Sequence, residues 1–221
     1  MKRNALVAIE TEARKFFVET TGCHDWSHVE RVRALARRIG REERADLFVL
    51  DAAVLLHDIA KVEEMRSRGG FCHAEEGAKR AIPVLEKQGI DAETIARIVH
   101  CIASHRNRSE GKSVPESLEA KILFDADKID SLGAVGVARD FLFAGMIGVT
   151  KLYAENEAEH AKNPKKYEYT EDDTAILEYE THLKGIKDRM LTKTGKTIAR
   201  ERSDFMKEFF AQFWKEVEGK C

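Results

Sequence analysis

The chain has 221 residues, of which 43% are hydrophobic and 34% are charged, and its formal net charge is −2. This length and hydrophobic content are enough for one sizeable core, so we expect a single domain over residues 1–221. The near balance of 37 basic and 39 acidic residues excludes a broad electrostatic attraction to nucleic acid or to an anionic membrane.

No uninterrupted apolar run approaches the roughly 20 residues needed to cross a bilayer. The N-terminal segment carries acidic residues where a signal peptide needs an apolar centre, so we expect a cytoplasmic protein. The cysteines form no CxxC pair, which argues against a disulfide framework and a structural zinc knuckle. They are Cys23, Cys72, Cys101 and Cys221.

Long stretches without helix breakers predict an all-α fold. We expect its core at about residues 20–145 and a C-terminal helical extension at about 150–221. The spacing of apolar residues predicts the helices in chain order. They cover residues 4–19, a segment opened by Ser27, residues 44–62, a segment opened by His73, a segment through Ile95 and Ile102, a segment through Ala120 and Asp127, residues 171–191 and residues 198–218.

Several local signals refine these helices. Ser27 with Glu30, and Ser113 with Glu116, have the pattern of capping boxes. Thr170 and Asp173 are candidate caps for the helix over 171–191, and Pro83 is expected to kink or divide its helix. The polar segments 66–71, 106–114 and 155–173 are predicted to be loops.

A histidine, an acid and a cation converge on the helix predicted over 44–62. His57 follows Leu50 by seven residues, so its ring is directed into the core beside Asp58, with Lys61 one turn further on. Buried acids are costly unless they are paired or bind a metal. On this segment alone, a buried Asp58–Lys61 ion pair beside a core histidine stays open as an alternative.

The same spacing argument places further polar side chains in the core. His105 and Asp127 share faces with apolar residues, whereas His100 shares a face with polar ones. Histidines and aspartates directed inward from different helices form a mixed nitrogen and oxygen ligand set, typical of Mn, Fe, Ni, Co or Zn rather than Ca. For His24, two interpretations stay open, a residue that lines the entrance of the site and an ordinary polar residue before a helix. His160 and His182 are expected to lie on exposed faces.

The order of these residues resembles the His, His-Asp, Asp signature of the HD-domain phosphohydrolase superfamily. The segments HDWSHVERV, LLHDIAK, DADKIDSLGAVGVAR and DRMLTKTGKTIARERSDFMKEFF are similar to one subgroup of small bacterial and archaeal HD hydrolases. The resemblance implies an HD-type helical bundle with one divalent metal ion (Mn, Fe, Ni, Co, Zn or Mg). Its implied ligands are His28, His57, Asp58 and Asp127.

Members of the superfamily with two ions have two more histidines between the His-Asp pair and the last aspartate. His73 and His105 resemble this pair, and Asp58 would then bridge the two ions. One ion or two stay open at this point.

The resemblance also implies the reaction. A metal-activated water, whose pKa falls to about 7, is expected to attack phosphorus without a covalent enzyme intermediate. Asp58 and Asp127 would orient this water, and Glu64 would transfer a proton. Lys61, Arg106 and Arg139 would bind phosphate oxygens, with Lys61 also counted among the catalytic residues.

The expected substrate is a small phosphorylated molecule, in particular a nucleotide, such as a triphosphate cleaved to monophosphate and pyrophosphate. Two other functions stay open, an HD-type di-iron oxygenase and a non-catalytic ligand-binding or signalling module. The sequence does not set the oligomeric state, and a homodimer is one option.

Overall fold

A computed structural model describes residues 2–18, 22–67, 70–106 and 114–221 of the chain, and these residues form helices and no strand. The all-α prediction is therefore confirmed. The chain divides into two compact units, the first comprising Met1–Asp127 with Leu191–Gly195 and the second Lys128–Met190 with Lys196–Cys221. No helix in the described parts is long and apolar enough to cross a membrane.

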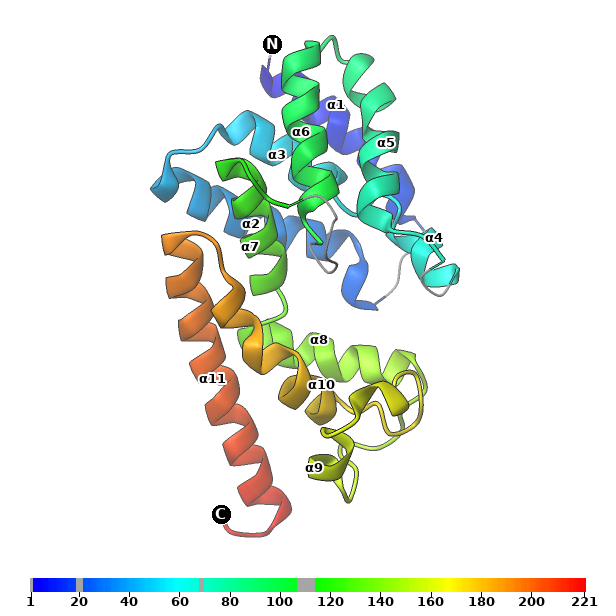
Figure 1. Cartoon of the computed structure of the whole chain (residues 1–221), viewed down its shortest axis with the longest axis vertical. Coiled ribbons are helices and arrows are strands. Elements are labelled where there is room, and N and C mark those ends of the chain that lie inside the picture. Colours follow the sequence, from blue (N-terminus) through cyan, green and yellow to red (C-terminus); the bar gives the residue numbers. More distant parts are fainter. Residues whose placement is uncertain (1, 19–21, 68–69, 107–113) are drawn as a thin grey trace. The chain divides into compact units, whose positions relative to one another are not determined.

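Seven α-helices carry the described core of the first unit (Figure 1). They are α1 (Lys2–Arg14), α2 (Trp26–Glu43), α3 (Leu47–Leu56), α4 (Lys61–Arg66), α5 (His73–Glu86), α6 (Ala92–Ser104) and α7 (Leu118–Ile129), whose last residues belong to the second unit. Short 3₁₀ helices cover Lys15–Phe17 and Gly22–His24.

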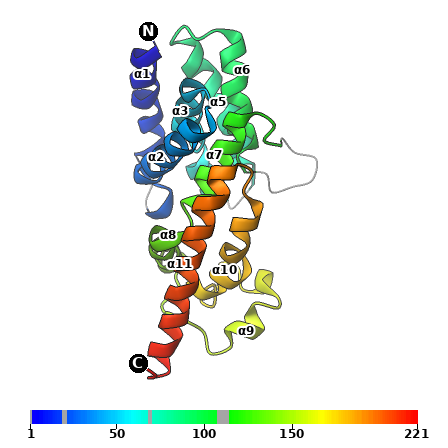
Figure 2. The same cartoon turned by 90° about the vertical axis from the view of Figure 1, so that its left-hand side faces the viewer.

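Helix α3 is the centre of the first unit. It contacts α1, α2 and α6, and Figure 2 shows it between α1 and α6. Every residue from Val49 to Leu56 is buried, as expected of a helix that is apolar on all sides. Its one charged residue, Asp51, accepts hydrogen bonds from Arg37 at 2.6–3.0 Å and is also paired with Arg33, so this buried charge is compensated.

Aspartates begin three of these helices. Asp25, Asp46 and Asp91 precede α2, α3 and α6, and each accepts a backbone amide of the first turn. The capping box predicted for Ser27 and Glu30 is therefore wrong, although His28 does lie in the first turn of α2. The Ser113 box falls outside the described residues, and the Ser117 hydroxyl accepts the amide of Ala120 at the start of α7.

The single helix predicted over 44–62 is wrong, because the chain leaves α3 after Leu56 and begins α4 only at Lys61. The His57 ring nitrogen Nδ1 contacts the carbonyl of Val54 at 2.7 Å. In a continuous helix that carbonyl would accept the amide of Asp58. The His-Asp pair thus lies in a turn at the end of a buried helix. Pro83, by contrast, does not divide α5, which continues to Glu86.

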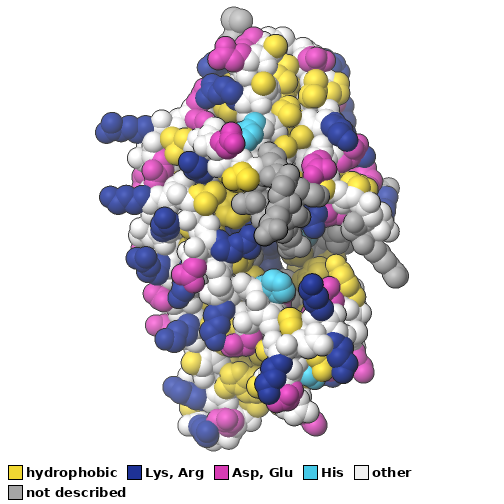
Figure 3. Space-filling view, viewed as in Figure 1, with side chains coloured by type: hydrophobic (Ala, Val, Ile, Leu, Met, Phe, Trp, Pro, Cys, Tyr) yellow, Lys and Arg dark blue, Asp and Glu magenta, His cyan; other side chains and the backbone are white. Residues whose placement is uncertain are grey.

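The second unit contains α8 (Gly133–Met146), α9 (Glu157–His160), α10 (Ala175–Thr181) and most of α11 (Lys193–Val217), with 3₁₀ helices at Pro164–Lys166 and Leu183–Arg189. The predicted helix over 171–191 is thus two shorter elements, and the cap is Thr174, whose hydroxyl accepts the amide of Leu177. The cap predicted at Thr170 and Asp173 is wrong. On the face drawn in Figure 3, basic and acidic side chains are interspersed over the described residues.

A buried aspartate fixes the start of α11, which begins five residues before the predicted one at Ile198. Asp125 is fully buried in α7 and accepts the amides of Leu191 and Thr192 and the Thr192 hydroxyl, at 2.6–2.8 Å. A Cβ atom at Gly195 would lie 2.2 Å from Asp125 Oδ2 and 2.7 Å from Thr192 Oγ1. Only glycine therefore fits at this position without moving the carboxylate.

We expect Gly195→Ala to destabilise the fold, because the Asp125 carboxylate cannot shift without weakening the hydrogen bonds to Leu191 and Thr192. Overpacking of this kind costs about 1–3 kcal/mol. Chemical denaturation would measure the change in free energy of unfolding. Gly185→Ala is the control, because nothing lies within 4 Å of its added Cβ. Equal stability of the two variants would contradict the role given to this contact.

A second prediction concerns Asp140 in α8, which is 7% exposed and whose Oδ2 has no hydrogen-bond partner. Burial raises the pKa of this carboxyl to about 9, and the charges of Glu178 and Asp173 add to the shift. The folded state therefore holds a proton that the unfolded state has released, and stability falls as the pH rises toward 9.

Asp140→Asn removes this ionisation, so its advantage over the wild type should grow between pH 5 and pH 8. We expect a gain in Tm of about 4 °C or more at pH 8, since 1 kcal/mol corresponds to about 2–4 °C in a chain of this size. Thermal unfolding at a series of pH values measures it. The exposed Asp188→Asn serves as the control, and parallel pH profiles for both variants would refute the assignment.

Candidate metal centre

Helix ends of the first unit bring five polar side chains to one place. His28 lies in the first turn of α2, the His57-Asp58 pair follows α3, His73 begins α5 and His105 follows α6. Each of the four histidines is at most 4% exposed, and so is Asp58. Such burial of polar groups requires partners for their nitrogen and oxygen atoms.

One cluster combines His28, His57, one oxygen of Asp58 and Asp127, which lies near the end of α7. His28 Nε2 is 3.4 Å from both Asp127 Oδ1 and His57 Nε2. Asp58 Oδ2 is 3.7 Å from the Nε2 atoms of both histidines. The structure thus brings together the side chains that the sequence predicted as ligands of one ion.

The other oxygen of Asp58 faces a second cluster. Asp58 Oδ1 is 3.2 Å from His73 Nε2 and 3.6 Å from His105 Nε2, and these two nitrogens are 3.2 Å apart. The His73 and His105 rings therefore lie beside Asp58 in the arrangement predicted for a second ion. Asp58 contributes one carboxylate oxygen to each cluster.

The hydrogen bonds of the rings test whether a cation fits. His57 and His105 each direct Nδ1 at a backbone carbonyl, that of Val54 at 2.7 Å and that of Ile102 at 2.6 Å. A carbonyl only accepts, so Nδ1 carries the proton and Nε2 of the neutral ring presents a lone pair to the cluster. Lone pairs directed at one another and at a carboxylate are stabilised by a cation, and the donor set therefore fits divalent metal ions.

The protonation states agree with this arrangement. Burial lowers the pKa of His57 to about 4, so the ring is neutral at pH 7. Burial acts to raise the pKa of Asp58, but the electrostatic effect of His57 and the approach of His105, His24 and His73 to its oxygens hold that pKa well below the ordinary value. Burial also acts to lower the pKa of His73, yet hydrogen bonds to Asp58 and Glu64 raise it, so a metal ion at this ring would compete with a proton.

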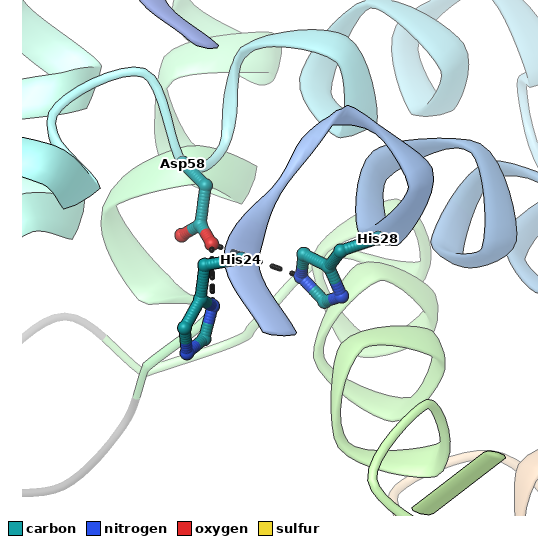
Figure 4. A group of neighbouring side chains, drawn as sticks. All are labelled: His24, His28 and Asp58. Carbon is teal, nitrogen blue, oxygen red and sulfur yellow. Dashed lines mark ion pairs between the residues drawn. The ribbon is translucent and has the colours of Figure 1, made fainter. Parts of the chain in front are cut away.

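The structure adds a residue to which the sequence gave no role. His24, in the 3₁₀ helix before α2, directs Nδ1 at Asp58 Oδ2 over 3.6 Å, and that nitrogen is buried without a hydrogen-bond partner. Figure 4 shows His24 and His28 both approaching this one carboxylate oxygen. In the sequence, His24 stands four residues before His28. This spacing brings both rings to Asp58 only because the chain turns between the 3₁₀ helix and α2.

The other predicted site residues have definite partners. Lys61 and Arg106 both contact the Glu64 carboxylate, which also accepts Nδ1 of His73 at 2.8 Å. Arg139 lies in the second unit and donates to Asp130 at 2.7 Å, so its role as a phosphate ligand stays a prediction. His182 is exposed, as expected, and His160 stacks on Tyr167.

Comparisons with known proteins identify the family of this chain. The family model of the HD domain matches residues 25–132. The YpgQ protein of Bacillus subtilis is 32% identical over 217 residues, covering 96% of this chain and 93% of that protein.

Solved structures extend the likeness to the whole chain. The crystal structure of Bacillus subtilis YpgQ in complex with ADP has a TM-score of 0.72 at 29% identity and covers 97% of this chain and 96% of that one. An HD-superfamily hydrolase from Bacillus thuringiensis has a TM-score of 0.74 at 27% identity, with 99% of each chain covered. Both units therefore have counterparts in these structures.

Metal stoichiometry tests the two clusters. We expect about two manganese ions per wild-type chain, about one in His105→Ala, and the largest loss in Asp58→Ala, because Asp58 faces both clusters. Plasma mass spectrometry after dialysis against MnCl₂ gives the count. His182→Ala, an exposed histidine of the second unit, is the control. Unchanged metal content in Asp58→Ala would overturn the assignment.

Proposed function

Because this chain belongs to the HD-domain superfamily, we propose that it is a metal-dependent phosphohydrolase that cleaves a phosphoester or phosphoanhydride bond of a nucleotide. The observation that carries the proposal is the Asp58 carboxylate, buried between two clusters of imidazole nitrogens. Such a site serves to activate water and to neutralise phosphoryl oxygens.

Two ions would share Asp58. His28, His57 and Asp127 would hold one of them, and His73 and His105 the other. When bound, such ions supply a nucleophilic water at neutral pH and a Lewis acid for the phosphoryl group. The contribution of the chain is to keep the His57, His105 and His73 rings in the tautomer that offers Nε2, through the hydrogen bonds from Nδ1 to Val54, Ile102 and Glu64.

Positive charge beside the clusters supports a phosphorylated substrate. Lys61 and Arg106 are 16% and 25% exposed in their side chains, so each has a face open to solvent. Both side chains contact Glu64, which also accepts a hydrogen bond from Nδ1 of His73. Nε2 of the same ring faces Asp58, so His73 lies between the Glu64 carboxylate and the second cluster. Phosphoryl oxygens could bind both cations there.

The nucleotide part of the proposal rests on likeness. YpgQ, which is similar over nearly the whole chain, has been crystallised in complex with ADP. A site with two ions and two nearby cations suits a polyphosphate, so a nucleoside triphosphate split into monophosphate and pyrophosphate is the substrate we expect. The second cluster would also suit a di-iron oxygenase, which is the alternative that the assay has to separate.

The decisive assay supplies Mn²⁺ with a panel of nucleoside triphosphates, diphosphates and a generic phosphomonoester, and identifies the products by chromatography. We expect pyrophosphate and monophosphate from triphosphates. Asp58→Ala should lower kcat more than about a hundredfold, because metal-derived charge stabilisation is worth several kcal/mol. Asp172→Ala, a surface aspartate paired with Lys151, should keep full activity.

Two results would contradict the proposal. One is equal turnover by Asp58→Ala and the wild type. The other is oxygen consumption by the iron-loaded protein, with no release of phosphate or pyrophosphate from any substrate, which would favour the oxygenase.

A further inference from the structure

The Glu64 carboxylate in α4 has several partners beside the metal centre. It is 4% exposed. Oε2 accepts hydrogen bonds from Lys61 Nζ at 2.9 Å and from His73 Nδ1 at 2.8 Å. Oε1 accepts from Arg106 Nη1 and from the backbone amide of His73 at 3.4 Å. One buried carboxylate therefore joins two cations to a histidine of the second cluster.

This contact sets His73 apart from His57 and His105, the other two histidines of the clusters with a defined Nδ1 partner. Backbone carbonyls orient His57 and His105 through Nδ1, whereas a side chain from a different helix orients His73. With Nδ1 bound to Glu64, the ring presents Nε2 to Asp58 Oδ1 and to His105 Nε2, each at 3.2 Å. The second cluster thus depends on a residue that cannot itself reach an ion.

The same carboxylate fixes the two cations. Lys61 lies in the first turn of α4 and Arg106 follows α6, so the two reach one place only because both contact Glu64. One negative and two positive charges leave this corner with a net charge of +1, counting Lys61, Arg106 and Glu64. Phosphoryl oxygens could therefore bind the two cations while Glu64 stays ionised.

The hydrogen bonds argue against proton transfer by Glu64. An ionised carboxylate has about four lone-pair sites. The four donors from Lys61, Arg106 and His73 occupy them. A proton acceptor for the reacting water would need a free site within hydrogen-bond reach.

We propose that Glu64 is a positioning residue that couples the second ion site to a phosphate anchor formed by Lys61 and Arg106. The inference rests on the proposed function. Through His73, Glu64 sets the affinity of the second ion, and through the two cations it sets the affinity for a phosphoryl group. Loss of the Glu64 charge therefore changes both affinities. Loss of His73 changes only the affinity for the second ion, and loss of Lys61 changes only the affinity for a phosphoryl group.

Calorimetric titration of the metal-free protein with MnCl₂ alone tests the first half. The wild type should show two binding events. In Glu64→Gln the second should weaken by about 10–100-fold, the usual effect of removing a group that orients a metal-bound histidine. The first event should persist, which also demonstrates an intact fold. Glu63→Gln, the neighbouring acid paired with Arg80, should leave both events unchanged.

Inhibition by inorganic phosphate tests the second half. Lys61→Met should raise the inhibition constant by about tenfold, the loss of one charge-assisted contact. Glu64→Gln should raise it by a similar factor, because Lys61 and Arg106 lose the carboxylate that holds them together. Only Glu64→Gln should also alter the second Mn²⁺ event. In a His73→Ala background, Glu64→Gln should have no further effect on Mn²⁺ binding, because the coupling runs through that ring.

The outcomes separate this inference from the proposed function. A wild type that binds no Mn²⁺ or hydrolyses no phosphorylated substrate would overturn the function. A functional wild type whose Glu64→Gln variant keeps both Mn²⁺ events, but loses one limb of the pH–rate profile, would show proton transfer and overturn the inference. Loss of the first event together with the second would also overturn it, because Glu64 would then support the fold alone.

Discussion

The first unit depends on one constraint, the burial of the Asp58 carboxylate at the end of a helix that is itself buried on all sides. A carboxylate in such surroundings is stable only if polar hydrogens or cations surround it. Histidines from four different segments approach its two oxygens at 3.2–3.7 Å. The same packing that buries α3 therefore buries Asp58 and requires the histidines to converge on it.

The rings are held in two different ways. His57 and His105 both follow a buried helix directly and direct Nδ1 at the carbonyl three residues earlier. This orientation therefore depends on backbone carbonyls. His73 instead depends on Glu64 from α4, so its geometry responds to the charges that surround that acid. The two clusters thus share a carboxylate but differ in how firmly the chain positions them.

The similarity to Bacillus subtilis YpgQ includes the second unit, which lies mostly outside the HD-domain match. The HD-domain match ends at residue 132, whereas Bacillus subtilis YpgQ aligns over 96% of the chain. Inside the first unit, the segment 191–195 is held by Asp125, two residues before Asp127 on α7. The short stretch DADKID therefore supplies a site residue at Asp127 and an anchor for the start of α11 at Asp125.

The sequence by itself determined the helical class and the predicted inward direction of His57, His105 and Asp127, because apolar periodicity is a local property. The assignment of Asp127 as a ligand came from the resemblance to the HD signature. It did not determine where helices end at the site. A continuous helix over 44–62 agreed with the periodicity, whereas α3 ends at Leu56 and the His57 ring contacts the Val54 carbonyl. The approach of His24 to Asp58 and the contacts of Glu64 with His73 and Arg106 join residues from separate segments. Such contacts exist only after the segments pack, so only the tertiary structure decided them.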